Sequence, residues 1–92
     1  MIVRIFSDGQ YRIPDAAHTR LHELDAETVK AIDSGDEAAF GATYGALIDL
    51  IHSEGERLAD DELVPSDLML PPADISLAEA REEFTGEGLI PD

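Results

Sequence analysis

Two helices are predicted by residues 15–55, DAAHTRLHELDAETVKAIDSGDEAAFGATYGALIDLIHSEG. At 100° per residue, the apolar side chains of the first half fall on one stripe, and those of the second half fall on one broad face. The stripe contains Ala17, Leu21, Leu24, Thr28, Ala31 and Ile32. The broad face contains Phe40, Thr43, Tyr44, Leu47, Leu50 and Ile51. Each helix can therefore bury one side against the other.

Polar segments mark the ends of both helices. Asp15 is the predicted N-cap of the first helix, which we expect to run to about Ile32 before an Asp-Ser-Gly segment stops it. Ser34 and Glu37 form a Ser-x-x-Glu capping box for the second helix, and Gly55 ends it. Because only a few residues join the helices, we expect an antiparallel helical hairpin.

The residues before the helices predict a β-hairpin. Residues 1–6, MIVRIF, are apolar with one exception, and their β-branched Ile and Val favour a strand. Residues 7–10, SDGQ, form a turn segment in which Gly9 can supply a positive φ. Residues 11–13 then form a short return strand, which Pro14 ends.

The last third of the chain predicts shorter elements. Residues 56–66 are expected to form a loop, and residues 68–70, LML, a third strand or extended segment docked on the hairpin. Ser76 and Glu79 make a second capping box, before a helix over residues 77–84. The expected buried side of this helix consists of Leu77, Ala80 and Phe84. 

Together these elements predict one α+β domain over residues 1–92. It contains an N-terminal β-hairpin, an antiparallel two-helix hairpin, a short third strand and a short C-terminal helix. A chain of 92 residues is too short for two independent cores. Its hydrophobic fraction of 43% is close to that of ordinary globular proteins, which argues against intrinsic disorder.

The charge of the chain is strongly negative. Asp and Glu number 21 and Lys and Arg only 6, so the formal net charge is −15, and Lys30 is the single lysine. Carboxylates at this density repel one another at low salt. At about 1 M salt the Debye length is roughly 3 Å, so the dissolved ions screen most of that repulsion. We interpret the composition as halophilic adaptation; the alternative is an acidic protein from a GC-rich genome.

The composition also excludes several classes of function. Without Cys there are no disulfides, thiolate nucleophiles or Cys-ligated metals. Six cations do not provide the clustered Lys and Arg that nucleic acids require. No apolar run approaches the ~20 residues of a membrane span, and MIVRIF is too short for a secretory signal. We therefore expect a cytoplasmic protein without direct membrane insertion.

His18 and His22 are the strongest candidates for metal ligands. They stand at i, i+4 on a predicted helix, which places both imidazoles on one face, with Asp15 on the same side. A further ligand would have to come from elsewhere, and His52 is the only other histidine. The alternative interpretation is two polar residues at the edge of an amphipathic stripe.

No other catalytic or cofactor motif is present in the sequence. It contains no Gly-x-Ser-x-Gly, no phosphate-binding glycine loop, and too many carboxylates to nominate one as a general acid. We therefore assign no catalytic, cofactor or metal residues, and no enzyme activity. An apolar set in the last third either covers the core or binds a partner, and the sequence does not separate these. Its members are Leu63, Val64, Leu68, Met69, Leu70, Ile75, Leu89 and Ile90.

Several segments, taken in order, resemble the PspAA family, small companions of phage shock protein A in archaea and actinobacteria. They are residues 1–5, 9–12, 63–68 with 70–71, the 76–81 helix start, and Gly88-Leu89-Ile90-Pro91. The resemblance covers essentially the whole chain. It implies a non-catalytic accessory of PspA, a coiled-coil, membrane-associated protein, in an envelope stress response. It also implies recruitment to the inner face of the membrane through that partner.

Three hypotheses about function follow. The first is a non-catalytic interaction protein of a PspA-type system, with homo-oligomerisation left open. The second is a small metal-binding or enzymatic domain that uses His18 and His22. The third is a transcriptional regulator, against which the −15 charge argues strongly.

Overall fold

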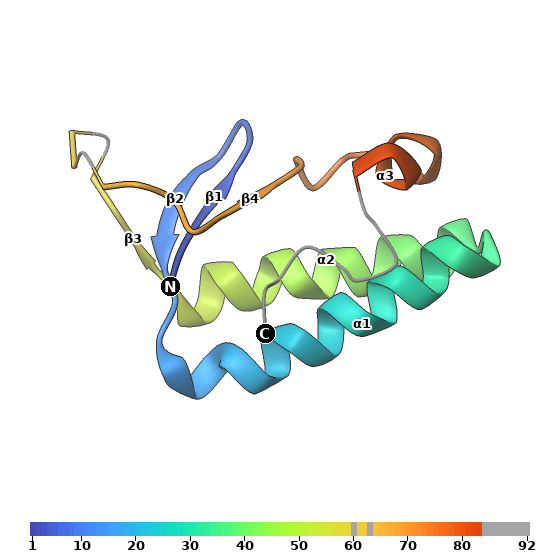
Figure 1. Ribbon diagram of the computed structural model, residues 1–92, viewed down its shortest axis with the longest axis horizontal. Coiled ribbons are helices and arrows are strands. Elements are labelled where there is room, and N and C mark those ends of the chain that lie inside the picture. The colour runs from blue at the N-terminus through green and yellow to red at the C-terminus, as the bar shows by residue number, and fades with distance from the viewer. Residues whose placement is uncertain (60, 63, 84–92) are drawn as a thin grey trace.

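The computed structural model describes residues 1–59, 61–62 and 64–83, and it confirms the α+β class (Figure 1). Two long helices lie side by side, and the strands and the last helix lie along one side of this pair. The elements are β1 (Ile2–Ile5), β2 (Gly9–Arg12), a 3-10 turn (Asp15–Ala17), α1 (His18–Ser34), α2 (Glu37–Glu54), β3 (Glu56–Arg57), β4 (Leu68–Leu70) and α3 (Leu77–Glu83).

The strands form one four-stranded sheet in the order β3-β2-β1-β4. β1 and β2 form the predicted antiparallel hairpin, with Val3 opposite Tyr11. The expected third strand, β4, docks on this hairpin and runs parallel to β1, with Leu68 opposite Val3. A parallel pair needs a long crossover connection. Here the connection contains the helical hairpin, so the helices lie between the two strands in sequence.

β3 corrects the prediction of an uninterrupted loop over residues 56–66. Glu56 and Arg57 pair with the edge of β2, and Leu58 N donates to Gln10 O at 2.9 Å. Both strand residues are exposed and charged. A strand of two exposed charged residues carries no alternation of apolar and polar side chains, which is the signal that predicts a strand.

α1 and α2 pack as the predicted antiparallel hairpin and supply half of the core residues in the described part of the chain (Figure 1). Leu21 of α1 and Leu47 and Ile51 of α2 are completely buried. Full burial of such a side chain stabilises the fold by about 1.5–3 kcal/mol. The predicted stripe on α1 is buried throughout, while Thr43 and Leu50 of α2 lie only partly buried at the border of its face.

The starts of both long helices differ from the prediction. Asp15 begins the 3-10 turn and makes no capping hydrogen bond. Ser34 is the last residue of α1, where its Oγ donates to Ala31 O at 3.1 Å, so it does not form a capping box with Glu37. The N-cap of α2 is Asp36, whose Oδ1 accepts from Ala39 N at 3.0 Å. The reason is that α1 continues past Ile32, which moves the start of α2 towards the C-terminus.

Two backbone positions also differ from expectation. In the β1–β2 turn Ser7, not Gly9, has the positive φ, of 68°, because Gly9 is already paired with Ile5 in β2. Gly55 ends α2 in an extended conformation with φ −82°. A Cβ at Gly55 would meet the carbonyl oxygen of Ile51 and lie 2.9 Å from Ile13 Cδ1. Glycine is therefore required there by close approach.

The second capping box is confirmed at the start of α3. Glu79 N donates to Ser76 Oγ at 3.1 Å, and Ser76 N donates to Glu79 Oε1 at 3.3 Å. Leu77 and Ala80 are buried, and Arg81 Nη2 donates to Ile32 O at 3.5 Å. α3 is thereby held against the end of α1. The expected contact of Phe84 lies outside the described residues.

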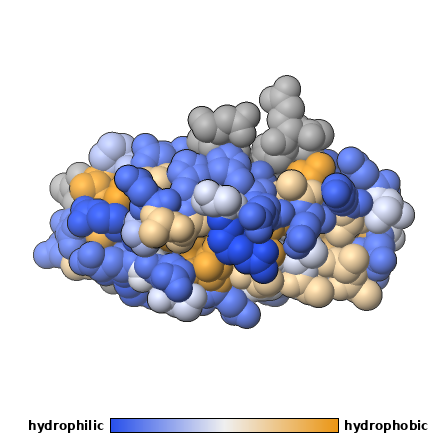
Figure 2. Space-filling model, turned by 90° about the horizontal axis from the view of Figure 1, so that it is seen from below, coloured by the Kyte–Doolittle hydropathy of each residue, from blue (hydrophilic) through white to orange (hydrophobic). Residues whose placement is uncertain are grey.

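The surface is largely polar, as one face of the molecule shows (Figure 2). Hydrophilic residues cover most of this view, with smaller hydrophobic areas between them. Within residues 1–59, 61–62 and 64–83, no helix combines the length and hydropathy needed to cross a bilayer. 

Candidate functional site

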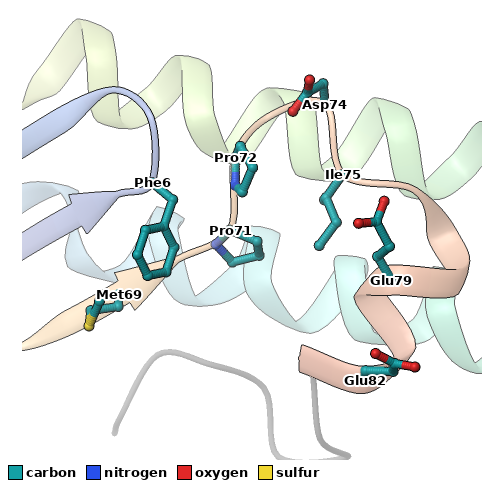
Figure 3. A pocket seen from close by; sticks show the side chains of 8 residues that line it. All are labelled: Phe6, Met69, Pro71, Pro72, Asp74, Ile75, Glu79 and Glu82. Atoms are coloured by element: carbon teal, nitrogen blue, oxygen red, sulfur yellow. The ribbon is translucent and has the colours of Figure 1, made fainter.

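A pocket of about 560 Å³ lies between the tip of the β-hairpin and α3 (Figure 3). We call it the Phe6–Met69 pocket; its lining residues are Phe6, Met69, Pro71, Pro72, Asp74, Ile75, Glu79 and Glu82. Phe6 and Met69 lie on one side, and Glu79 and Glu82 of α3 lie on the other (Figure 3). Every charged residue that the described part of the chain contributes to this lining is acidic.

Phe6 and Met69 are the exposed large apolar residues of the described chain, each with 50% of its surface accessible. Met69 points outward because β4 alternates, with Leu68 and Leu70 buried beneath the sheet. Phe6 follows β1 directly, at the start of the turn. Both side chains expose apolar surface to water in the monomer, and burial of that surface against another molecule would be favourable. The pair is therefore suited to contact another molecule.

The floor of the pocket is fastened to the core. Phe6 N donates to Leu70 O at 3.0 Å, which continues the pairing of β1 with β4. The hydroxyl of Tyr44, on α2, donates to the carbonyl oxygen of Pro71. Burial raises the pKa of this tyrosine, so the hydroxyl keeps its proton. The end of β4 is therefore held by the residue that follows β1, and the segment after β4 is held by α2, so these contacts within the fold shape the pocket.

A polar cluster lies beside the same hairpin turn. Asp8 Oδ2 is 2.6 Å from His52 Nε2, at the end of α2. The other carboxylate oxygen, Oδ1, accepts from the hydroxyl of Tyr11 at 2.8 Å and from Arg57 Nη1 at 3.2 Å. Arg57 Nη2 also donates to the backbone oxygen of Asp8 at 3.1 Å. One carboxylate thus joins the turn to β2, β3 and α2.

The cluster stabilises the charged form of its carboxylate. The hydrogen bond from His52 lowers the pKa of Asp8 most, and the Tyr11 hydrogen bond and the charges of His52 and Arg57 lower it further. Burial, and then the neighbouring carboxylate, raise the pKa of Tyr11. Both oxygens of Asp8 are occupied by donors from the fold itself. The arrangement is suited to holding the turn in place.

His18 and His22 lie together on α1, as their i, i+4 spacing predicts. Their rings are nearly parallel, at 6°, and their Nε2 atoms are 2.8 Å apart. At this distance one imidazole N–H donates to the other ring. The third histidine, His52, is bound to Asp8 instead. Among the described residues no group of three or more His, Asp or Glu side chains is arranged to hold a metal ion, so the metal-dependent hypothesis gains no support there.

The segment before β4 is fixed by side-chain hydrogen bonds to the hairpin. Gln10 is buried, and its Nε2 donates to Val64 O at 3.0 Å and to Ser66 Oγ at 2.8 Å. Asp67 Oδ2 accepts from Ile2 N at 2.8 Å. These contacts connect two of the segments on which the family resemblance is based, residues 9–12 and 63–68. Their role in this structure is to align β4 with β1.

The family model of the PspA-Associated protein, PspAA, matches residues 1–92. The chain belongs to the PspAA family. No curated protein and no solved structure matches it. The resemblance seen in the sequence is thereby confirmed along its whole length. Membership in PspAA makes this chain a PspA-associated accessory protein.

The apolar set left open in the sequence of this PspAA protein divides between the core and the surface. Leu68 and Leu70 are buried in the core, and Val64 and Ile75 are half-buried. Met69 is the member that is exposed at the pocket. The remaining members, Leu63, Leu89 and Ile90, lie outside the described residues. 

Sequence reasoning did not find the pocket or the Asp8 cluster. His52 is 44 residues from Asp8, and Arg57 is 49 residues from it, so no local spacing relates them. The signal for Phe6 is Arg4: the charged residue marks the solvent face of the strand, and a period of two places Phe6 on the same face. For Met69 the signal is the predicted strand over residues 68–70, since a strand places its middle residue on the face opposite to that of its two neighbours.

Proposed function

We propose that this protein is a non-catalytic accessory that binds a PspA-type protein in an envelope stress response. The observation that carries the proposal is the match of the PspAA family model to residues 1–92. The exposed Phe6 and Met69, which line the pocket, support a role in binding. As part of the proposal, the protein acts in the cytoplasm and reaches the inner face of the membrane through its partner, which has the helical, coiled-coil character that the family resemblance implies.

The interaction can be tested with purified components. The full chain and the PspA-type protein encoded in the same genome are mixed at the salt concentration of the native cytoplasm and analysed by size-exclusion chromatography with light scattering. We expect a complex of defined stoichiometry. Separate elution of the two proteins across micromolar concentrations would contradict the proposal.

The cellular role has its own test. Deleting the gene should alter the response of the cells to membrane-damaging agents in the same direction as deleting the gene for the PspA-type protein. Fractionation of cells that lack the PspA-type protein should then leave this chain out of the membrane fraction. Membrane recovery independent of the partner would contradict recruitment through it.

A further inference from the structure

We infer that the Phe6–Met69 pocket binds a partner segment in which bulky apolar side chains stand next to lysine or arginine. The inference deepens the proposed function and rests on it, because it names the chemistry of the partner at the same pocket. It is carried by the juxtaposition of an exposed apolar pair on the sheet with carboxylates on and before α3 (Figure 3).

The apolar side of the pocket fits side chains of a partner. Phe6 and Met69 are half exposed, and Ile75 is half-buried between them and α3. A volume of about 560 Å³ lies within the usual range of sites that enclose a ligand. Bulky apolar side chains inserted here would cover both exposed residues, and the burial of this apolar surface would stabilise the complex.

The acidic side of the pocket selects the charge of the partner. Neither Asp74 nor Glu82 is paired with a cation within the part of the chain that the structure describes. Glu79 Oε1 is already bonded to Ser76, but its carboxylate charge remains in the lining. Lysine or arginine beside an apolar anchor would form charge-assisted hydrogen bonds here. A carboxylate in the same place would be repelled.

Two other occupants are disfavoured by the same charges. A second copy of this chain brings a further net charge of −15 to an acidic lining. The chain's own residues 84–92 contain Leu89 and Ile90, but their charged side chains are the acids Glu87 and Asp92. Charge complementarity therefore favours a basic segment of another protein over both.

The test uses two synthetic peptides and the full chain labelled with 15N. One peptide has a Leu-Leu pair between lysines, and its twin has glutamate in place of each lysine. The titration is performed at about 1 M KCl, where a Debye length of roughly 3 Å limits long-range attraction by the whole acidic surface. We expect the lysine peptide to shift amide resonances of residues 5–8 and 68–82 in a saturable way, and the glutamate peptide to shift none of them.

Three double variants locate the binding. F6S/M69S removes the apolar anchors, and D74K/E82K reverses two charges while leaving the capping bond of Glu79 intact. E27K/D49K changes the net charge by the same amount at exposed positions outside the pocket lining. We expect roughly tenfold or greater weakening of lysine-peptide binding in each pocket variant, as for the loss of interface hot spots. The control variant should bind within about threefold of the unchanged protein.

The outcomes separate this inference from the proposed function. If the PspA-type protein binds but D74K/E82K and F6S/M69S leave that binding unchanged, the inference is wrong and the proposed function stands. If the lysine peptide binds at the pocket but the PspA-type protein does not bind, the proposed function fails and the pocket chemistry stands. Equal binding of both peptides, or binding to all three variants alike, would overturn the inference. Dimerisation abolished by F6S/M69S would assign the pocket to a second copy and overturn it too.

Discussion

Tyr44 and Asp8 each form side-chain hydrogen bonds between parts of the fold that the backbone hydrogen bonds of the sheet do not connect. Tyr44 connects α2 to the backbone at Pro71, beneath the pocket. Asp8 connects the hairpin turn to His52 and Arg57, which are distant in sequence. Both contacts act on segments that carry exposed pocket residues. The shape of the pocket therefore depends on two side chains that do not bind the partner themselves.

Tyr44→Phe should destabilise the fold and loosen the pocket. The change removes a buried hydrogen bond and leaves the Pro71 carbonyl without its donor, for which we expect a loss of about 1–2 kcal/mol in the free energy of unfolding. Urea denaturation measures it. Tyr11→Phe is the control: its hydroxyl bonds Asp8, whose side chain is 24% exposed, so water can replace the bond and the loss should be smaller. Equal losses would contradict this account of Tyr44.

Asp8→Asn should change the dependence of stability on pH. Because the folded pKa of Asp8 is lowered, its contribution is fully present above the unfolded value, near 3.8, and is lost as the pH falls through the folded pKa. At neutral pH the free energy of unfolding should be higher for the unchanged protein than for the Asp8→Asn variant. The difference between the two should become smaller at acidic pH. Urea titrations at several pH values measure it, with exposed Asp49→Asn as control. A difference that grows on acidification would contradict the assignment.

At the scale of elements, two residues are candidates for the N-cap of α2, Ser34 and Asp36. Asp36 accepts the Ala39 N–H, whereas the Ser34 hydroxyl bonds back into α1. Asp36→Ala should therefore cost about 1 kcal/mol of unfolding free energy, as for other N-cap deletions. Ser34→Ala should cost less, because it removes no cap. The same denaturation assay measures both, and a larger loss from Ser34→Ala would restore the capping box that the sequence suggested.

The elements that could be predicted from the sequence are mainly those in which apolar residues recur at regular spacing or in a continuous run. α1, α2 and β1 show a helical stripe or a β-branched apolar run, and the Ser76–Glu79 box marks the start of α3. β3 could not be predicted, because it is formed by pairing with β2 alone. The site could not be predicted either, since its walls come from residues near 6, 70 and 80 that only the tertiary fold brings together.

At the scale of the whole molecule, net charge opposes compactness in dilute salt. With a formal charge of −15 on 92 residues, self-repulsion destabilises the folded state until salt screens it. We expect the midpoint of thermal unfolding to rise between low and multimolar KCl. Circular dichroism measures the midpoint, and E27K/D49K, with a smaller net charge, should show a smaller rise. A midpoint unaffected by KCl would contradict the halophilic interpretation.

Contact with the partner through the Phe6–Met69 pocket is what we infer for this PspAA protein. Hydrogen–deuterium exchange of the chain, alone and in complex with the PspA-type protein, tests it most directly. We expect slower exchange at residues 5–8 and 68–82 in the complex and little change on the outer face of α1. Protection confined to α1 and α2, with exchange around the pocket unaltered, would contradict it.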